Sequence, residues 1–185
     1  MLIYYMKQLH KAYEDEDSAR DKVITISRDI IKQSKKIISA VHKEEIDAAR
    51  KLIPAIEKSL KEITKNYGIS RTGSFDVAVQ EYIEAILYLE YVATGKVVAH
   101  TKFDSSASNY IMGLCDFVGE LQRRSVMQIA KGNNTEIKKI YKDVEIIYTE
   151  LLDISMRGEM RKKFDSLKYI MIRMEEMQMQ LKLKE

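Results

Sequence analysis

The stretch VITISRDIIKQSKKIISAV, residues 23–41, decides the fold class of this chain. Its apolar residues recur at the spacing of one face of an α-helix: Val23, Ile26, Ile30, Ile37 and Val41. The opposite side, extended a few residues toward the N-terminus, is basic and carries Arg20, Lys22, Arg28, Lys32, Lys35 and Lys36. The pattern predicts a long amphipathic helix.

The same periodicity continues along the chain, and glycines mark most of its breaks. We expect a second helix that begins near Glu44 or Glu45, bends at Pro54 and ends in a left-handed cap at Gly68. Four more helices are predicted over about residues 75–94, 108–131 and 134–156 and from Gly158 nearly to the C-terminus, with Gly95 and Gly132 as stops and Asn134 or Thr135 as a cap. The sequence thus predicts an all-α fold, one bundle of six to seven helices forming a single domain over residues 1–185.

Composition narrows the class of protein further. One proline and seven glycines in 185 residues leave few of the turns that a sheet protein needs. The net charge of +3, from 31 basic and 28 acidic residues, predicts neither a nucleic-acid arm nor a membrane-binding tail. The single Cys115 cannot form an intrachain disulfide, and there is no signal peptide or apolar run of about 20 residues. A cytoplasmic protein without membrane partners is expected.

Two predicted helices carry pairs of carboxylates. Glu81 and Glu84 are three residues apart, and Asp116 and Glu120 are four apart, so each pair shares one side of its helix. Asp116 is the only charge between Tyr110 and Gly119. A buried carboxylate needs a cation, a donor or access to solvent. Two such pairs can hold a hard divalent cation, and a metal-bound water can hydrolyse phosphodiesters.

The spacing alone leaves other interpretations open. Glu81 and Glu84 fit a solvated helix surface as well as a ligand set, and Asp116 and Glu120 can instead pair with Arg123, Arg124 or a lysine elsewhere. If a metal binds, carboxylate ligands favour Mg²⁺ or Mn²⁺. Iron and zinc are disfavoured, since Cys115 has no partner cysteine and the histidines are scattered, at His10, His42 and His100.

Two glycines lie inside the predicted helix that carries Asp116. Gly113 and Gly119 each cost about 1 kcal/mol there relative to alanine. We expect them to allow close packing of helices, with room for a ligand beside Asp116 as the alternative.

Several motifs, in order along the chain, resemble the translin/TRAX family. They are Ser27-Arg28-Asp29-Ile30, Gln80-Glu81-Tyr82-Ile83-Glu84-Ala85, Gly113-Leu114-Cys115-Asp116-Phe117-Val118-Gly119-Glu120-Leu121 with Gly132-Asn133, and Arg161-Lys162-Lys163-Phe164-Asp165-Ser166-Leu167-Lys168-Tyr169. The resemblance covers about residues 18–181. Asn133 stands where the family usually has aspartate, and the family's closing Arg-Gly segment is missing.

The resemblance implies a seven-helix fold assembled into a hollow, octamer-like homo-oligomeric shell that binds single-stranded RNA. It also implies a metal-dependent endoribonuclease, because the acids of the catalytic TRAX type fall on Glu81, Glu84 and Asp116, with Glu120 beside them. Glu81, Glu84 and Asp116 are then the ligands of Mg²⁺ or Mn²⁺, and Glu120 helps ligation or orients the attacking water. The rival hypotheses are a non-catalytic scaffold for single-stranded RNA or DNA, as in the translin type, and a helical adaptor with no role in RNA.

Basic residues near these helices are the candidates for RNA contact, and they are Arg28, Lys32, Lys35, Arg71, Arg123 and Arg124. A solvated basic face is the alternative for each of them. Tyr82, Tyr88 and Tyr91 can stack on bases, but core packing is the preferred interpretation for all three.

Overall fold

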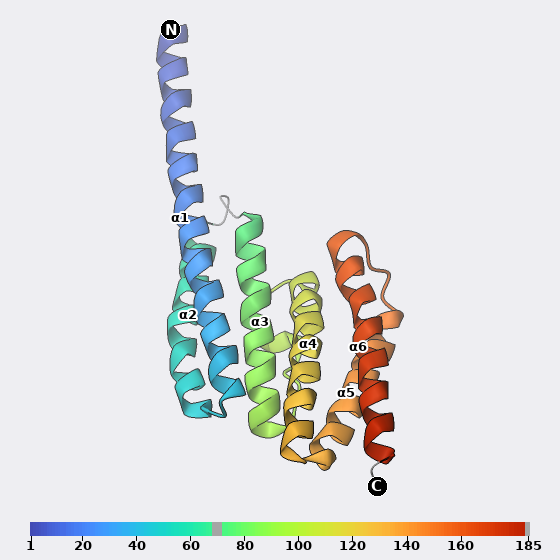
Figure 1. The fold of residues 1–185 in the computed structure, drawn as a ribbon. Coiled ribbons are helices and arrows are strands. Elements are labelled where there is room, and N and C mark those ends of the chain that lie inside the picture. The colour runs from blue at the N-terminus through green and yellow to red at the C-terminus, as the bar shows by residue number, and fades with distance from the viewer. Residues whose placement is uncertain (68–71, 184–185) are drawn as a thin grey trace. The chain divides into compact units, whose positions relative to one another are not determined.

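The computed structural model describes residues 1–67 and 72–183, and these residues form six α-helices and one 3₁₀ turn, with no strands (Figure 1). The elements are α1 (Leu2–His42), α2 (Ile46–Asn66), α3 (Gly73–Thr94), η2 (His100–Lys102), α4 (Ala107–Lys131), α5 (Asn134–Leu152) and α6 (Gly158–Lys182). The predicted all-α fold is confirmed. None of the described helices is both long and apolar enough to cross a bilayer.

Contacts within the chain define two compact units, residues 1–89 and residues 90–185, with the boundary inside α3. Each unit is described by itself below. The first contains α1, α2 and most of α3, and the second contains the end of α3 with α4, α5 and α6. One domain over residues 1–185 stays a prediction.

The first unit is built on a hairpin of α1 and α2. The buried positions of α1 alternate in steps of four and three residues, which keeps one face against the core: Val23, Ser27, Ile30, Ser34, Ile37 and Val41. Ile26, predicted to be on this face, is only half-buried. The turn places Glu44 at φ 64°, and Glu45 is the N-cap, so α2 begins at Ile46. Pro54 lies inside α2, whereas Gly68 lies outside the described residues.

Tyrosines of α3 attach it to this hairpin. The Tyr88 hydroxyl is 3.0 Å from Nδ1 of His42, and the Tyr82 hydroxyl donates to Glu57 at 3.1 Å. Both tyrosine rings are buried, which confirms core packing as their role. Burial, together with the charge of Glu57, raises the pKa of Tyr82 well above its usual range.

The second unit packs α4, α5 and α6 against one another. Ser106 caps α4 by accepting a hydrogen bond from the Asn109 amide at 3.1 Å, and Gly132 ends α4 at φ 75°. The predicted cap of α5 was one residue late, because Asn133 is the N-cap. The predicted end near Met156 was four residues late. Met156 is buried in the connection after Leu152, so its place in the apolar pattern does not require a helix.

Candidate active site and nucleic-acid interface

The acid pair of α3 lies in the first unit. Glu81 and Glu84 are one helical turn apart, and Glu84 is only 9% exposed. The Glu81 carboxylate is 3.7 Å from Nζ of Lys35 on α1. Lys35 thereby offsets the charge of the Glu81 carboxylate, which is 22% exposed.

The lysine that meets Glu81 belongs to an exposed basic row on α1. Arg28, Lys32, Lys35 and Lys36 are all exposed, at the spacing of one helical side. Lys35 is 64% exposed at its side chain even while it pairs with Glu81. The first unit therefore places a line of positive charge next to an acid pair.

The acid pair of α4 lies in the second unit. Lys163 of α6 donates to the Asp116 carboxylate, and the side chains are 26% and 31% exposed, respectively. Burial raises the pKa of Asp116 above its usual range, and the hydrogen bond and charge of Lys163 oppose that rise. The same burial, with the charge of Asp116, raises the pKa of Cys115 to about 12, so its thiol is unreactive at neutral pH.

Two arginines follow Asp116 on α4, and their surroundings differ. Arg123 is exposed and lies 3.8 Å from Glu120. Arg124 is buried and donates to Glu136 of α5. Glu136 also accepts a hydrogen bond from the Asn133 side chain at 3.0 Å. Arg124 thus ties α4 to the start of α5, a placement that argues against direct contact with RNA, whereas Arg123 remains available to a phosphate.

Lys163 is the residue of this site that the sequence did not single out. It stands in a basic run with Arg161 and Lys162, and it is 47 residues from Asp116. The helical positions of α6 contain a sign that Lys163 faces the rest of the protein. Lys163 flanks the buried Phe164 and lies one turn before the buried Leu167, whereas Arg161 and Lys162 pair with acids of their own helix. The contact agrees with the alternative interpretation of the sequence, in which Asp116 pairs with a lysine elsewhere in the chain.

The other residues considered in the sequence are Arg71, Tyr91 and the histidines. Arg71 lies outside the described residues. Tyr91 is buried and donates to Asp143 at 2.6 Å, which makes it a packing residue like the other two tyrosines. Of the three histidines, His42 is held by Tyr88 in the first unit.

The donor chemistry of the two acid pairs fits a hard divalent cation, because every candidate ligand is a carboxylate oxygen. Each unit supplies one pair, Glu81 with Glu84 and Asp116 with Glu120. Within residues 1–67 and 72–183, no group of three His, Cys, Asp or Glu side chains forms a ready metal site. Lys35 and Lys163 hold two of the carboxylates where a metal cation would compete with them.

Gly119, between Asp116 and Glu120, has space around it. A Cβ built on Gly119 meets no atom within 4 Å, so close helix packing does not explain this glycine in the chain itself. Gly113 is buried. Within residues 1–67 and 72–183, nothing packs closely on Gly119, and space lies beside the acid pair there.

Gly119→Ala is expected to raise the free energy of unfolding by about 0.5–1 kcal/mol, because alanine favours the helix and meets no clash. Urea denaturation measures the change. The matched control is Gly132→Ala, which is expected to destabilise the protein because φ is 75° there. A loss of stability in Gly119→Ala would contradict the open space at this position.

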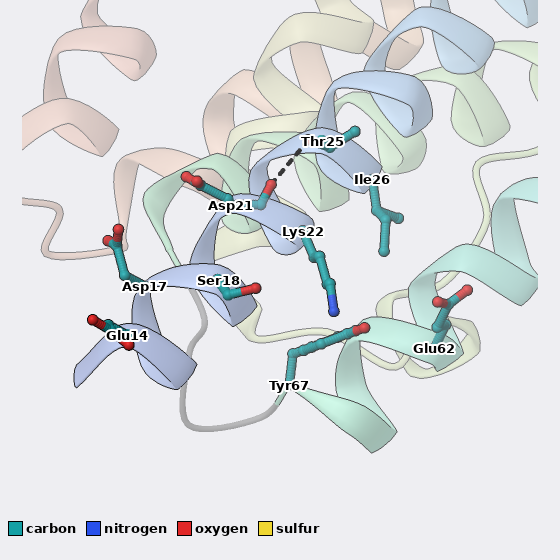
Figure 2. A pocket seen from close by; sticks show the side chains of 9 residues that line it. All are labelled: Glu14, Asp17, Ser18, Asp21, Lys22, Thr25, Ile26, Glu62 and Tyr67. Atoms are coloured by element: carbon teal, nitrogen blue, oxygen red, sulfur yellow. Dashed lines mark hydrogen bonds between the residues drawn. The ribbon is translucent and has the colours of Figure 1, made fainter. Parts of the chain in front are cut away.

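An open hollow of about 600 Å³ lies between α1 and the end of α2 (Figure 2). Four of its nine lining residues are acidic, namely Glu14, Asp17 and Asp21 on α1 and Glu62 on α2, and one, Lys22, is basic. None of the predicted site residues lines it. Its charge repels phosphate, so we do not place RNA there.

Residues 1–67 and 72–183 thus define an all-helical protein with carboxylate pairs on two successive long helices and an exposed basic row on the first helix. The model of the Translin family matches residues 18–185, and the chain belongs to that family.

The chain is similar to two curated proteins. It is 27% identical over 143 residues to an uncharacterized protein of Methanocaldococcus jannaschii, covering 75% of this chain. It is 25% identical over 152 residues to the translin-associated protein X homolog of Schizosaccharomyces pombe, covering 72% of this chain. The matched region spans 64% of the length of each relative.

Solved structures share the fold. AfC3PO has a TM-score of 0.88 at 20% identity, with 97% of this chain and 98% of that chain covered. Its complex with duplex RNA gives 0.83 at 19% identity, covering 97% of each chain. The apo form of NeC3PO gives 0.82 at 24% identity, covering 92% of this chain and 94% of that chain.

Proposed function

We propose that this protein is a metal-dependent endoribonuclease that binds and cleaves single-stranded RNA as a homo-oligomer. The observation that carries the proposal is the contact between Lys35 and Glu81, which joins the exposed basic row of α1 to the acid pair of α3. An RNA whose phosphates bind along this basic row would lie beside the carboxylates of α3. Membership of the Translin family and the complex of AfC3PO with duplex RNA support the RNA-binding part of this proposal.

In this proposal Glu81, Glu84 and Asp116 hold Mg²⁺ or Mn²⁺, and Glu120 helps ligation or orients the attacking water. When bound, the metal lowers the pKa of a water molecule and offsets charge on the phosphate. The paired lysines have a second role. Lys35 and Lys163 pair with two of these carboxylates in the free protein, and where a metal took their place their ammonium groups would be free to contact the phosphates of the RNA.

A second candidate function is a non-catalytic scaffold for single-stranded RNA or DNA. The observation that favours it is that Glu81, Asp116 and Glu120 each already pair with a basic side chain. Binding and cleavage of one labelled single-stranded RNA, measured in parallel with Mg²⁺, separate the two functions. Cleavage supports the nuclease, binding without cleavage supports the scaffold, and the absence of both contradicts a role in RNA.

Neutralising Arg28 and Lys32 together, as Arg28→Gln with Lys32→Gln, is expected to weaken RNA binding and its dependence on salt. Each lost phosphate contact reduces the slope of log K against log salt by about 0.7 for single strands, so the pair should reduce it by about 1.4. Filter binding at several salt concentrations measures the slope.

The matched control is Lys58→Gln with Lys61→Gln, which removes two exposed positive charges from α2 instead. The control is expected to leave the slope nearly unchanged. Equal changes in the two double variants would mean that net charge, rather than the row on α1, determines binding.

A further inference from the structure

Among the described residues, the first part of α1 is almost entirely exposed. α1 extends past the end of α2 (Figure 1), and in residues 2–22 every side chain except Ala19 is exposed. We call residues 2–22 the stem; the Translin family model begins at residue 18, whereas the AfC3PO structure covers 97% of the chain. An isolated helix of about this length is only marginally stable in water. The described residues leave the stem exposed, so a contact from outside them would stabilise it.

The stem carries the apolar face that such a contact requires. Leu2, Met6, Leu9 and Tyr13 are 43% to 73% exposed. They repeat at steps of four, three and four residues, the same alternation as the buried face of α1 from Val23 to Val41. This is the seam pattern of two helices that wind around each other. The core face of α1 thus continues, uncovered, to the N-terminal end of the helix.

The charges of the stem are divided between its two halves. Residues 1–13 contain Lys7 and Lys11 and no acid, whereas residues 14–17 are Glu14, Asp15, Glu16 and Asp17. Two stems side by side in parallel would set the four acids against their own counterparts, with Glu16 meeting Glu16 in the seam. Two antiparallel stems set the basic half of one beside the acidic half of the other. The stem therefore complements a second copy of itself in one orientation.

We propose that the stem pairs antiparallel with the stem of a second copy of this chain, with Leu9 of each copy packed against Tyr13 of the other. The pairing is isologous, with its two-fold axis near residue 11. Glu16 and Arg20, the next two positions of the seam, then lie opposite Met6 and Leu2 of the other copy and not opposite like charges. The pairing does not depend on the function proposed above.

Crosslinking of the full-length protein tests this geometry. In Ala12→Cys the introduced thiol lies close to its own counterpart across the axis, about 3 Å away along the helices. In Tyr5→Cys, on the same side of the helix, the two thiols are about 18 Å apart along the helices. A short bis-maleimide is expected to crosslink Ala12→Cys into covalent dimers and Tyr5→Cys at least roughly tenfold less. The wild type is the blank, because Cys115 is buried.

A second pair of variants tests the seam. Leu9→Glu in the Ala12→Cys background is expected to lower the crosslinked fraction roughly tenfold or more, whereas Gln8→Glu adds the same charge one residue away and should leave it unchanged. Equal crosslinking of the two cysteine variants would overturn the antiparallel pairing, and so would no crosslinking of either. Co-sedimentation with phosphatidylglycerol vesicles, abolished by Leu9→Glu in a protein that does not crosslink, would replace the second copy with a lipid surface.

Discussion

Asp116→Asn is expected to slow Mg²⁺-dependent cleavage of single-stranded RNA by roughly 100-fold or more. Asparagine keeps the shape of the side chain but removes the charge that attracts a hard cation and that holds Lys163. Stability should change by no more than about 1 kcal/mol, because burial already disfavours the charged carboxylate and this offsets the lost pairing with Lys163. Initial rates on a labelled RNA and a urea denaturation curve measure the two effects separately.

The matched control for this variant is Asp165→Asn on α6. Asp165 is 53% exposed, and its carboxylate pairs with Arg161 of the same helix at 2.8 Å. It is not one of the proposed metal ligands. It should retain the rate of the wild type. Cleavage by Asp116→Asn at the rate of the control would remove Asp116 from the proposed metal ligands.

Arg124→Met is expected to lower the free energy of unfolding by about 2–3 kcal/mol, since it leaves Glu136 without the cation that it pairs with across α4 and α5. Glu136 is 26% exposed, which keeps the loss below that of a fully buried pair. Urea denaturation measures it. The dependence of RNA binding on salt should not change, because a buried guanidinium does not contact phosphate.

The neighbouring Arg123→Met serves as the matched control. Arg123 is 64% exposed at its side chain, and the loss of a surface pair changes stability by about 0.5 kcal/mol or less. If the two variants lose equal stability, Arg124 does not have the structural role assigned to it here. If Arg124→Met alone flattens the salt dependence, the original interpretation of Arg124 as an RNA contact is restored.

Most of the helices could be predicted because burial and left-handed glycines leave clear marks in the sequence. Gly95 and Gly132 adopt φ of 71° and 75°, and the helices before them end where predicted. Residues 2–19 were not predicted as part of the first helix. Periodicity reveals a helix through its buried face, and no part of the chain that the structure describes buries the stem.

The candidate site could be predicted only in part. Acid pairs of a helix can be identified from spacing, since i,i+3 and i,i+4 positions share a side. Their partners cannot, because contacts such as Asp116 with Lys163 join residues 47 positions apart. Two adjacent arginines also look alike in the sequence, yet Arg123 is exposed and Arg124 is buried. Helical phase distinguishes them only once the neighbouring helices are known.

Cleavage of an end-labelled single-stranded RNA by the purified wild-type protein, with Mg²⁺ and then with EDTA, tests the central claim most directly. The account predicts internal cleavage products with Mg²⁺, their disappearance with EDTA, and their return when Mg²⁺ is added in excess. RNA that is bound at low salt but stays intact with Mg²⁺ and with Mn²⁺ would contradict the nuclease and leave the acids with a structural role.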